Sequence, residues 1–208
     1  MKGQAFIILS LILILFFFLV KQLDVFEFRE SYGIESLEFQ NLKEEVLKTV
    51  QISSPRIENI SENLNEFLKF ARNSFRSRSV ELNAFLAKIY YPNVTPNSNI
   101  SLNVSIFNLL GTSIEKLNLT FSYDNSSKNF SSVGDGQQVE TSFIFNTSST
   151  VNYTLKIFYN TSYENRTEEI LIPVGINKSK FIGFFDLGIE KDGLEKRDKI
   201  KVAYNLND

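Results

Sequence analysis

The chain has 208 residues and a nearly balanced charge, with 22 basic and 24 acidic residues and a formal net charge of −2. It contains no Cys, His or Trp, which excludes a disulfide framework, thiolate chemistry, Cys or His metal sites and histidine acid–base catalysis. The charge balance gives no electrostatic case for nucleic acid as a partner. The sequence has no phosphate-binding loop, dinucleotide fingerprint or serine elbow, so we expect no cofactor.

An uncharged apolar stretch occupies residues 5–20. As a helix it covers roughly 24 Å, and Leu23, Val25 and Phe26 extend it toward the roughly 30 Å of a bilayer core. The residues that follow offer no small-residue site for a signal peptidase. We therefore predict a transmembrane helix in a single-pass protein of the cell membrane, with the lipid bilayer as a partner, the N-terminus in the cytoplasm and the C-terminal domain extracellular.

The opening residues, Lys2-Gly3-Gln4 followed by the apolar stretch, resemble the class III signal peptide of archaeal type IV pilin-like proteins. The resemblance implies that a prepilin peptidase cuts between Gly3 and Gln4. Many pilins keep a Glu at the fifth position of the mature chain, where this chain has Ile8. The order of a helix pair and an Asn-rich β region is also similar to single-span surface proteins of archaea.

Two amphipathic helices are predicted after the anchor. Apolar residues recur at three- and four-residue steps from Ile34 to Val50, and again from Ile57 to Ser74. Ser54 and Pro55 supply a cap and a first helical residue for the second helix. The short link predicts an antiparallel hairpin. A basic cluster near the end of the second helix is expected to be a solvated helix end, with contact to anionic lipid or a surface polymer as the alternative; its members are Lys69, Arg72, Arg76 and Arg78.

Residues 81–91 fit either a continued helix or a strand, and an extended segment after a helix end near Ser77 is preferred. From residue 92 onward, runs such as 101–106, 117–122 and 151–157 alternate apolar and polar side chains. About seven short strands predict an antiparallel sandwich. The predicted fold class is α+β, with a transmembrane helix (1–28), a short helical hairpin stalk (29–91) and a C-terminal antiparallel β-sandwich of immunoglobulin-like architecture (92–208).

Asn-x-Ser/Thr sequons are far denser than composition alone would produce. Alternation on exposed strand faces explains some of them, such as Asn103, Asn118 and Asn152, but not those in predicted loops. We therefore predict extensive N-linked glycosylation. The sequons are at Asn59, Asn93, Asn99, Asn103, Asn118, Asn125, Asn129, Asn146, Asn152, Asn160, Asn165 and Asn177.

No catalytic motif is recognisable, and carboxylates such as Asp135 and Asp186 are expected to be solvated surface acids. The sequence thus predicts a non-enzymatic, membrane-anchored cell-surface protein with a structural or adhesive role, possible partners being copies of itself or other envelope proteins. The filament version packs residues 4–28 with copies of themselves. The alternative is an extracellular binding module or an accessory subunit of a surface or transport complex. That version needs a concave site with exposed aromatics, for which the candidates are Tyr90, Tyr91, Tyr123, Tyr159 and Tyr163.

Overall fold

A computed structural model describes residues 37–53, 57–92, 99–146, 152–173 and 179–206. The chain divides into two compact units, Met1–Leu42 and Lys43–Asp208. The description below concerns the second unit. The processing site predicted at Gly3 and Gln4 lies outside the described residues, as do Asn93 and Asn177.

The described chain begins with a helix at 37–53 and continues with α2 (Ile57–Arg76). Nine strands follow: β1 (Glu81–Tyr91), β2 (Asn99–Leu109), β3 (Ile114–Phe121), β4 (Ser126–Phe130), β5 (Gln138–Asn146), β6 (Tyr153–Thr161), β7 (Asn165–Ile172), β8 (Lys180–Lys191) and β9 (Leu194–Asn205). They form a five-stranded sheet in the order β5-β2-β1-β8-β9 and a four-stranded sheet in the order β4-β3-β6-β7. Every pairing is antiparallel.

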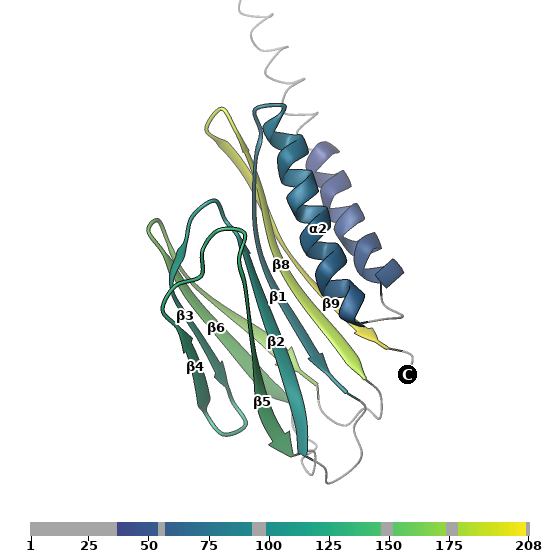
Figure 1. Ribbon diagram of the computed structural model, residues 1–208, viewed down its shortest axis with the longest axis vertical. Coiled ribbons are helices and arrows are strands. Elements are labelled where there is room, and N and C mark those ends of the chain that lie inside the picture. The colour runs from purple at the N-terminus through teal and green to yellow at the C-terminus, as the bar shows by residue number, and fades with distance from the viewer. Residues whose placement is uncertain (1–36, 54–56, 93–98, 147–151, 174–178, 207–208) are drawn as a thin grey trace, which may run out of the picture. The chain divides into compact units, whose positions relative to one another are not determined.

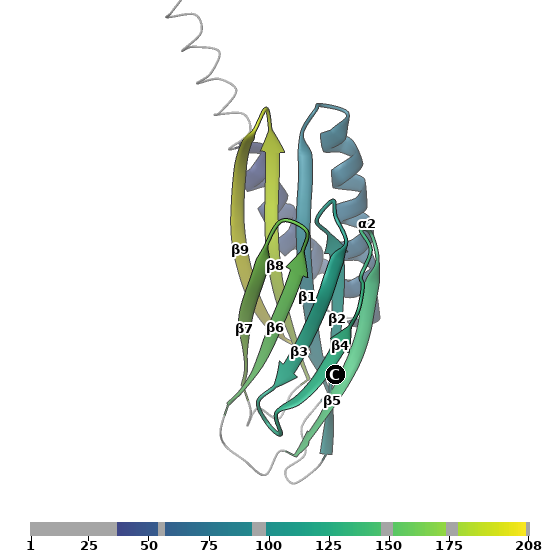
Figure 2. The ribbon, with the colours of Figure 1, turned by 90° about the vertical axis from the view of Figure 1, so that its left-hand side faces the viewer.

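The two sheets pack face to face, and the helical residues of this unit, 43–53 and α2, lie on the outer face of the five-stranded sheet (Figure 1). Seen after a quarter turn, the four-stranded sheet lies in front of the five-stranded one (Figure 2). Between the sheets is a continuous apolar core of buried side chains from seven of the nine strands, and the partly buried Phe130 of β4 packs against it. At one end of this core the rings of Phe121, Phe145 and Tyr153 meet at centroid separations of 5.6 to 5.7 Å, in the edge-to-face geometry that aromatic pairs prefer.

The central strands β1 and β8 are buried on both faces. In β1, Phe85 and Ile89 belong to the core between the sheets. Leu82 and Leu86 lie on the opposite face of the strand and are buried outside that core. The helical layer explains this second buried face, since α2 contacts β1. The buried side chains of α2 recur every three or four residues: Ile60, Leu64, Leu68, Ala71, Arg72 and Phe75.

Helix α2 ends in a tight turn that delivers the chain to the sheet. Ser79 has a φ of 59°, and the amide of Val80 donates to the carbonyl of Phe75 at 3.1 Å. A residue in the left-handed conformation, followed by a backbone hydrogen bond that reaches back five residues, is the Schellman motif that ends many helices. Val80 is buried, so the turn is anchored by an apolar contact and β1 starts at Glu81.

One ion pair ties α2 to the loops of the sandwich. Arg72 is 8% exposed, and its Nη1 lies 2.7 Å from Oδ2 of Asp135 in the loop between β4 and β5. Asp135 Oδ1 also accepts the amide of Gly111 at 3.0 Å. Gly111 has a φ of 78°, and a Cβ there would meet Asn83 Oδ1 at 3.3 Å. Arg72 is therefore no part of a solvated helix end, and Asp135 does more than shape a turn.

The predicted α+β fold class is contradicted. The described protein is mainly β, and its helices cover a sheet of the sandwich rather than forming a separate stalk. The preferred extended segment is β1, which lies at the centre of the five-stranded sheet although the predicted sandwich begins only at residue 92. The described residues also hold nine strands where about seven were expected.

The predictions of a transmembrane helix and of a single-pass cell-membrane localisation are contradicted. Within the described ranges, no helix has both the length and the apolar character that a membrane crossing requires. The stretch on which those predictions rest, residues 5–20, lies outside the described residues.

Candidate functional site

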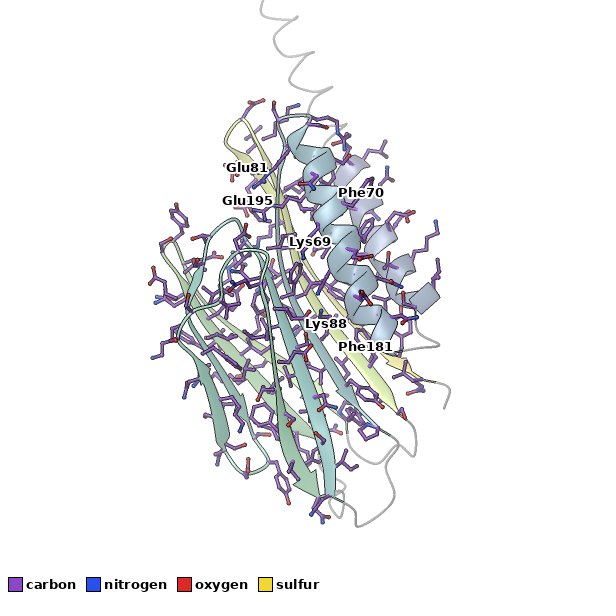
Figure 3. All side chains as sticks on the ribbon, in the orientation of Figure 1. Lys69, Phe70, Glu81, Lys88, Phe181 and Glu195 are labelled. Carbon is purple, nitrogen blue, oxygen red and sulfur yellow. The ribbon has the colours of Figure 1, made fainter. Side chains whose placement is uncertain are left out.

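A groove of about 470 Å³ opens between α2 and the five-stranded sheet. We call it the Lys88 groove; its walls include Ser61 of α2, Lys88 and Tyr90 of β1, Asn103 and Ser105 of β2 and Glu140 of β5. Figure 3 shows Lys88 and Phe181, a further wall residue, beside the N-terminal half of α2. The volume falls in the range of about 300–1,000 Å³ that is usual for small-molecule sites.

Strand register explains why the groove is open and polar. Lys88 of β1 lies opposite Ser105 of β2, which lies opposite Glu140 of β5. The next row, Tyr90, Asn103 and Ser142, is built in the same way. The central residue of the first row is a serine, which is too short to fill the space under α2. A large apolar side chain at that position would close the groove.

Lys88 is the buried charge of the groove, with only 4% of its surface exposed. Its Nζ donates to Asn65 Oδ1 at 2.9 Å and to Gln138 Oε1 at 2.8 Å, and lies 5.8 Å from the centre of the Phe107 ring. Burial lowers the pKa of Lys88 to about 7, while the negative charge of Glu140 opposes the shift. The amine is therefore held by neutral carboxamides and is partly unprotonated near pH 7.

Two hydroxyl groups of the groove have no hydrogen-bond partner among the described residues. Ser61 Oγ and Ser105 Oγ are both buried and both unpartnered, although both side chains line the groove. An unsatisfied buried hydroxyl costs about 1–3 kcal/mol. Folding alone would favour alanine at both positions.

Both of these serines complete a sequon. Ser61 is the third residue of Asn59-Ile60-Ser61, and Ser105 is the third residue of Asn103-Val104-Ser105. The two hydroxyls that the fold does not use are thus hydroxyls that N-glycosylation of Asn59 and Asn103 requires.

The ten described sequon asparagines all reach the surface at least in part. Seven are exposed and three are half-buried, the latter being Asn118, Asn146 and Asn160. By contrast Asn108, which belongs to no sequon, is fully buried. Its Nδ2 donates to the carbonyls of Thr112 and Val133 and its Oδ1 accepts from Leu110. The described sequon asparagines are therefore at least partly accessible, whereas Asn108 is buried by its structural role.

The sequons differ in how the side-chain nitrogen, where an N-glycan attaches, is engaged. Asn118 Nδ2 donates to Asn129 Oδ1 across β3 and β4, and Asn146 Nδ2 donates to Asn99 Oδ1 at 3.1 Å. At Asn103 only the oxygen is engaged by a described residue, accepting from Ser101 Oγ at 3.1 Å. Asn103 is thus better prepared for a glycan than Asn118.

Of the five tyrosines proposed for a concave site, Tyr90 lines the groove. Tyr91 and Tyr159 are buried. Tyr123 packs against Tyr153 at 5.3 Å between ring centres. Tyr163 is 86% exposed and borders a smaller hollow of about 180 Å³ near Arg197. The structure therefore does not gather these tyrosines into one site.

A second group of charges lies between the two sheets. Asp186 of β8 is completely buried. Its carboxylate accepts from Arg166 Nη1 of β7 at 2.6 Å and from Arg197 Nε and Nη2 of β9 at 2.6 and 3.0 Å. Glu164 pairs with Arg166 at 2.6 Å. We call Asp186, Arg166, Arg197 and Glu164 the Asp186 cluster, and it corrects the expectation that Asp186 is a solvated surface acid.

The Asp186 cluster neutralises itself. The bidentate contact of Arg197 and the contact of Arg166 satisfy both carboxylate oxygens of Asp186. The buried hydroxyl of Tyr159 lies close by without a partner among the described residues; its burial, together with the charge of Asp186, raises its pKa. The cluster joins β8 and β9 of one sheet to β7 of the other, which is a structural role.

Sequence reasoning missed both Lys88 and Asp186, although each has a visible signal. Lys88 is a lone charge in the run LNAFLAKIYY, and Asp186 is a lone charge in FIGFFDLGI. A single charge inside an apolar strand must be compensated when both faces of the strand are buried.

Comparison with known proteins assigns no family to the chain. No protein-family model matches it, and no curated protein matches it.

Proposed function

We propose that this chain is a non-enzymatic protein with a structural or adhesive role, built as a β-sandwich that carries N-linked glycans. The observation that carries the proposal is the pair of buried, unpartnered hydroxyls of Ser61 and Ser105. Each is costly to the fold and each is required by a sequon. The accessibility of the described sequon asparagines supports the same conclusion.

The described charged residues support a non-catalytic role. Asp186 is saturated by two arginines, and Arg72 is paired with Asp135 in a contact that docks α2. Lys88 contacts carboxamide oxygens rather than an acid that would relay its proton. These groups hold elements together, as expected of a module whose work is to present a surface.

The partners we propose are N-linked glycans and, through them or through protein faces, copies of the chain or other envelope proteins. The pilin-like resemblance of the opening residues adds one independent prediction, a mature chain that starts at Gln4. The binding-module alternative stays a prediction, with the Lys88 groove as its candidate concave site.

Intact mass and glycopeptide mapping of the protein from its native cells test this function. We expect several glycan masses, with Asn59 and Asn103 among the occupied sites, and N-terminal sequencing that begins at Gln4. A mass equal to that of the bare polypeptide would overturn the glycoprotein proposal. Occupied sequons on a chain that begins at Met1 would remove the pilin-like part and leave the rest.

A further inference from the structure

We propose that the Lys88 groove holds the first sugar of a glycan attached to Asn103 of the same chain. This inference rests on the proposed N-glycosylation and adds where one glycan lies and what it contacts. Asn103 forms part of the groove wall. It sits between Tyr90 and Ser142 in the sheet register, so a sugar on its nitrogen starts at the groove itself.

The nitrogen of Asn103 is prepared for this attachment. Its side chain is exposed, and its Oδ1 is held by the hydroxyl of Ser101 at 3.1 Å. No residue in the described ranges accepts a hydrogen bond from its Nδ2. The carboxamide is thus oriented through its oxygen while the nitrogen remains available.

The groove offers the contacts that a sugar ring needs. The side chains of Ser61 and Ser105 line the groove, and a rotation about χ1 would turn their buried, unpartnered hydroxyls toward a sugar hydroxyl, with which each can donate and accept. Glu140 supplies an acceptor and Lys88 a donor, while the ring of Tyr90 gives an apolar wall. A hydroxyl-rich ligand therefore satisfies polar atoms that the protein leaves unsatisfied.

The tether decides which sugar occupies the groove. A ligand attached through a short link has an effective concentration on the order of millimolar or higher. Weak contacts to a single ring are then sufficient for occupancy, and free saccharides compete poorly. The glycan of Asn103 is consequently the favoured occupant over sugars from other molecules.

Lys88 is a reporter for this occupancy, because its side chain lines the groove and its amine is partly unprotonated near pH 7. The experiment measures acylation of Lys88 by a small amine-selective reagent, using peptide mapping. It compares the natively glycosylated chain with Asn103→Gln, with the matched control Asn129→Gln on β4, and with Asn59→Gln. The unglycosylated chain from a host without N-glycosylation gives the open reference.

We expect Asn103→Gln to raise Lys88 acylation several-fold, to the level of the unglycosylated chain, while Asn129→Gln and Asn59→Gln leave it unchanged. If Asn103 carries a glycan in the native chain, and Lys88 is nevertheless acylated equally in the native chain and in Asn103→Gln, the inference is overturned. Protection that is lost in Asn59→Gln instead would assign the groove to the other glycan and overturn it too. If Lys88 stays unreactive in the unglycosylated chain, the groove admits no small molecule and the inference fails.

Glycopeptide mapping of the same samples separates this inference from the proposed function. Occupancy at other sequons with Asn103 empty would overturn the groove assignment alone. Absence of glycans at every sequon would overturn the proposed function as well.

Discussion

Lys88 and Asp186 are buried charges on neighbouring strands of one sheet, yet they are stabilised in opposite ways. Asp186 faces the four-stranded sheet and contacts two guanidinium groups. Lys88 faces the helical layer and contacts two neutral carboxamides. Burial of a charge costs several kcal/mol, so each site must compensate for it. In the Asp186 cluster the compensation is opposite charge. In the Lys88 groove the pKa of the amine is lowered, so that part of the lysine population is uncharged near pH 7.

This difference separates a structural site from a site with capacity for a ligand. The carboxylate of Asp186 has both oxygens satisfied inside the protein. Lys88 borders an open groove that also holds unpartnered hydroxyls. Replacing charges one at a time, in the order of their expected effects, tests the comparison.

The largest effect is expected for Asp186→Ala, which removes the buried partner of two arginines whose side chains are 22% and 18% exposed. Removing one partner of a buried ion pair costs about 3–5 kcal/mol, and we expect a loss of this size in urea unfolding. Asp198→Ala is the matched control, since that carboxylate is on the exposed edge strand β9 and pairs with Lys43. Equal losses in the two variants would show that the Asp186 cluster contributes no more than a surface pair.

Lys88→Met is expected to stabilise the unglycosylated chain at neutral pH. Because the folded-state pKa of Lys88 is lowered from 10.5 to about 7, the cost of burying its charge is fully present below pH 7. That cost disappears as the pH rises toward 10.5. With about 1.4 kcal/mol per pKa unit and a discount for water in the open groove, we expect about 2 kcal/mol.

The measurement is urea unfolding of the parent chain and Lys88→Met at several pH values between 6.5 and about 10. The parent chain should gain stability relative to the variant as the pH rises, and the difference between them isolates Lys88 from other titrating groups. A constant difference across this range would contradict the lowered pKa.

Arg72→Ala is expected to cost about 1–3 kcal/mol, because it leaves Asp135 without its cation at a partly buried site. The side chain of Asp135 retains 31% exposure, so the loss is smaller than for Asp186. Arg76→Ala, on an exposed residue of the same helix, is the control. Thermal unfolding followed by circular dichroism should show one shifted transition. A helical signal lost before the β signal would mean that α2 and the sandwich unfold separately.

The smallest effect is expected for Glu169→Gln, which removes a pair with Lys156 on the outer face of the four-stranded sheet. The two side chains are 63% and 53% exposed and lie 3.6 Å apart, and exposed pairs contribute at most about 1 kcal/mol. We expect a change in unfolding free energy of less than about 0.5 kcal/mol. A larger loss in urea unfolding would mean that this surface pair contributes like a buried one.

The sequence predicted most clearly those strands that have one exposed face, whereas β1, which is buried on both faces, was predicted only as the preferred one of two alternatives. The alternation of Leu102, Val104 and Ile106 with polar residues corresponds to β2. Strand β1 has buried residues on both faces, so its run of apolar residues carries no period and remained ambiguous between helix and strand. The helical layer buries the second face of β1 and so removes the alternation of polar and apolar residues from its sequence. The helical residues that were expected to form a stalk pack on the sandwich instead.

The candidate site was predicted in part. Asn59 and Asn103 are visible as sequons, but no local pattern shows that Ser61 of a helix and Ser105 of a strand line the same groove. That depends on the docking of α2, which Arg72 and Asp135 fix over a long separation in sequence. Lys88 in β1 and Asp186 in β8 can be recognised in the sequence as single charges within apolar strands, but the residues that contact them cannot.

The pairing of β1 with β8 determines when, during synthesis of the chain, the larger sheet can close. Glu81 pairs with Glu190 and Tyr91 with Lys180, so the centre of the larger sheet closes only after residues 180–190 have been made. Such distant pairings form slowly. Every sequon after Asn59 lies in the segment between these two strands. On the proposed N-glycosylation, the glycosylating enzyme would meet those asparagines on an open chain, before the fold that later buries parts of Asn118 and Asn146 exists.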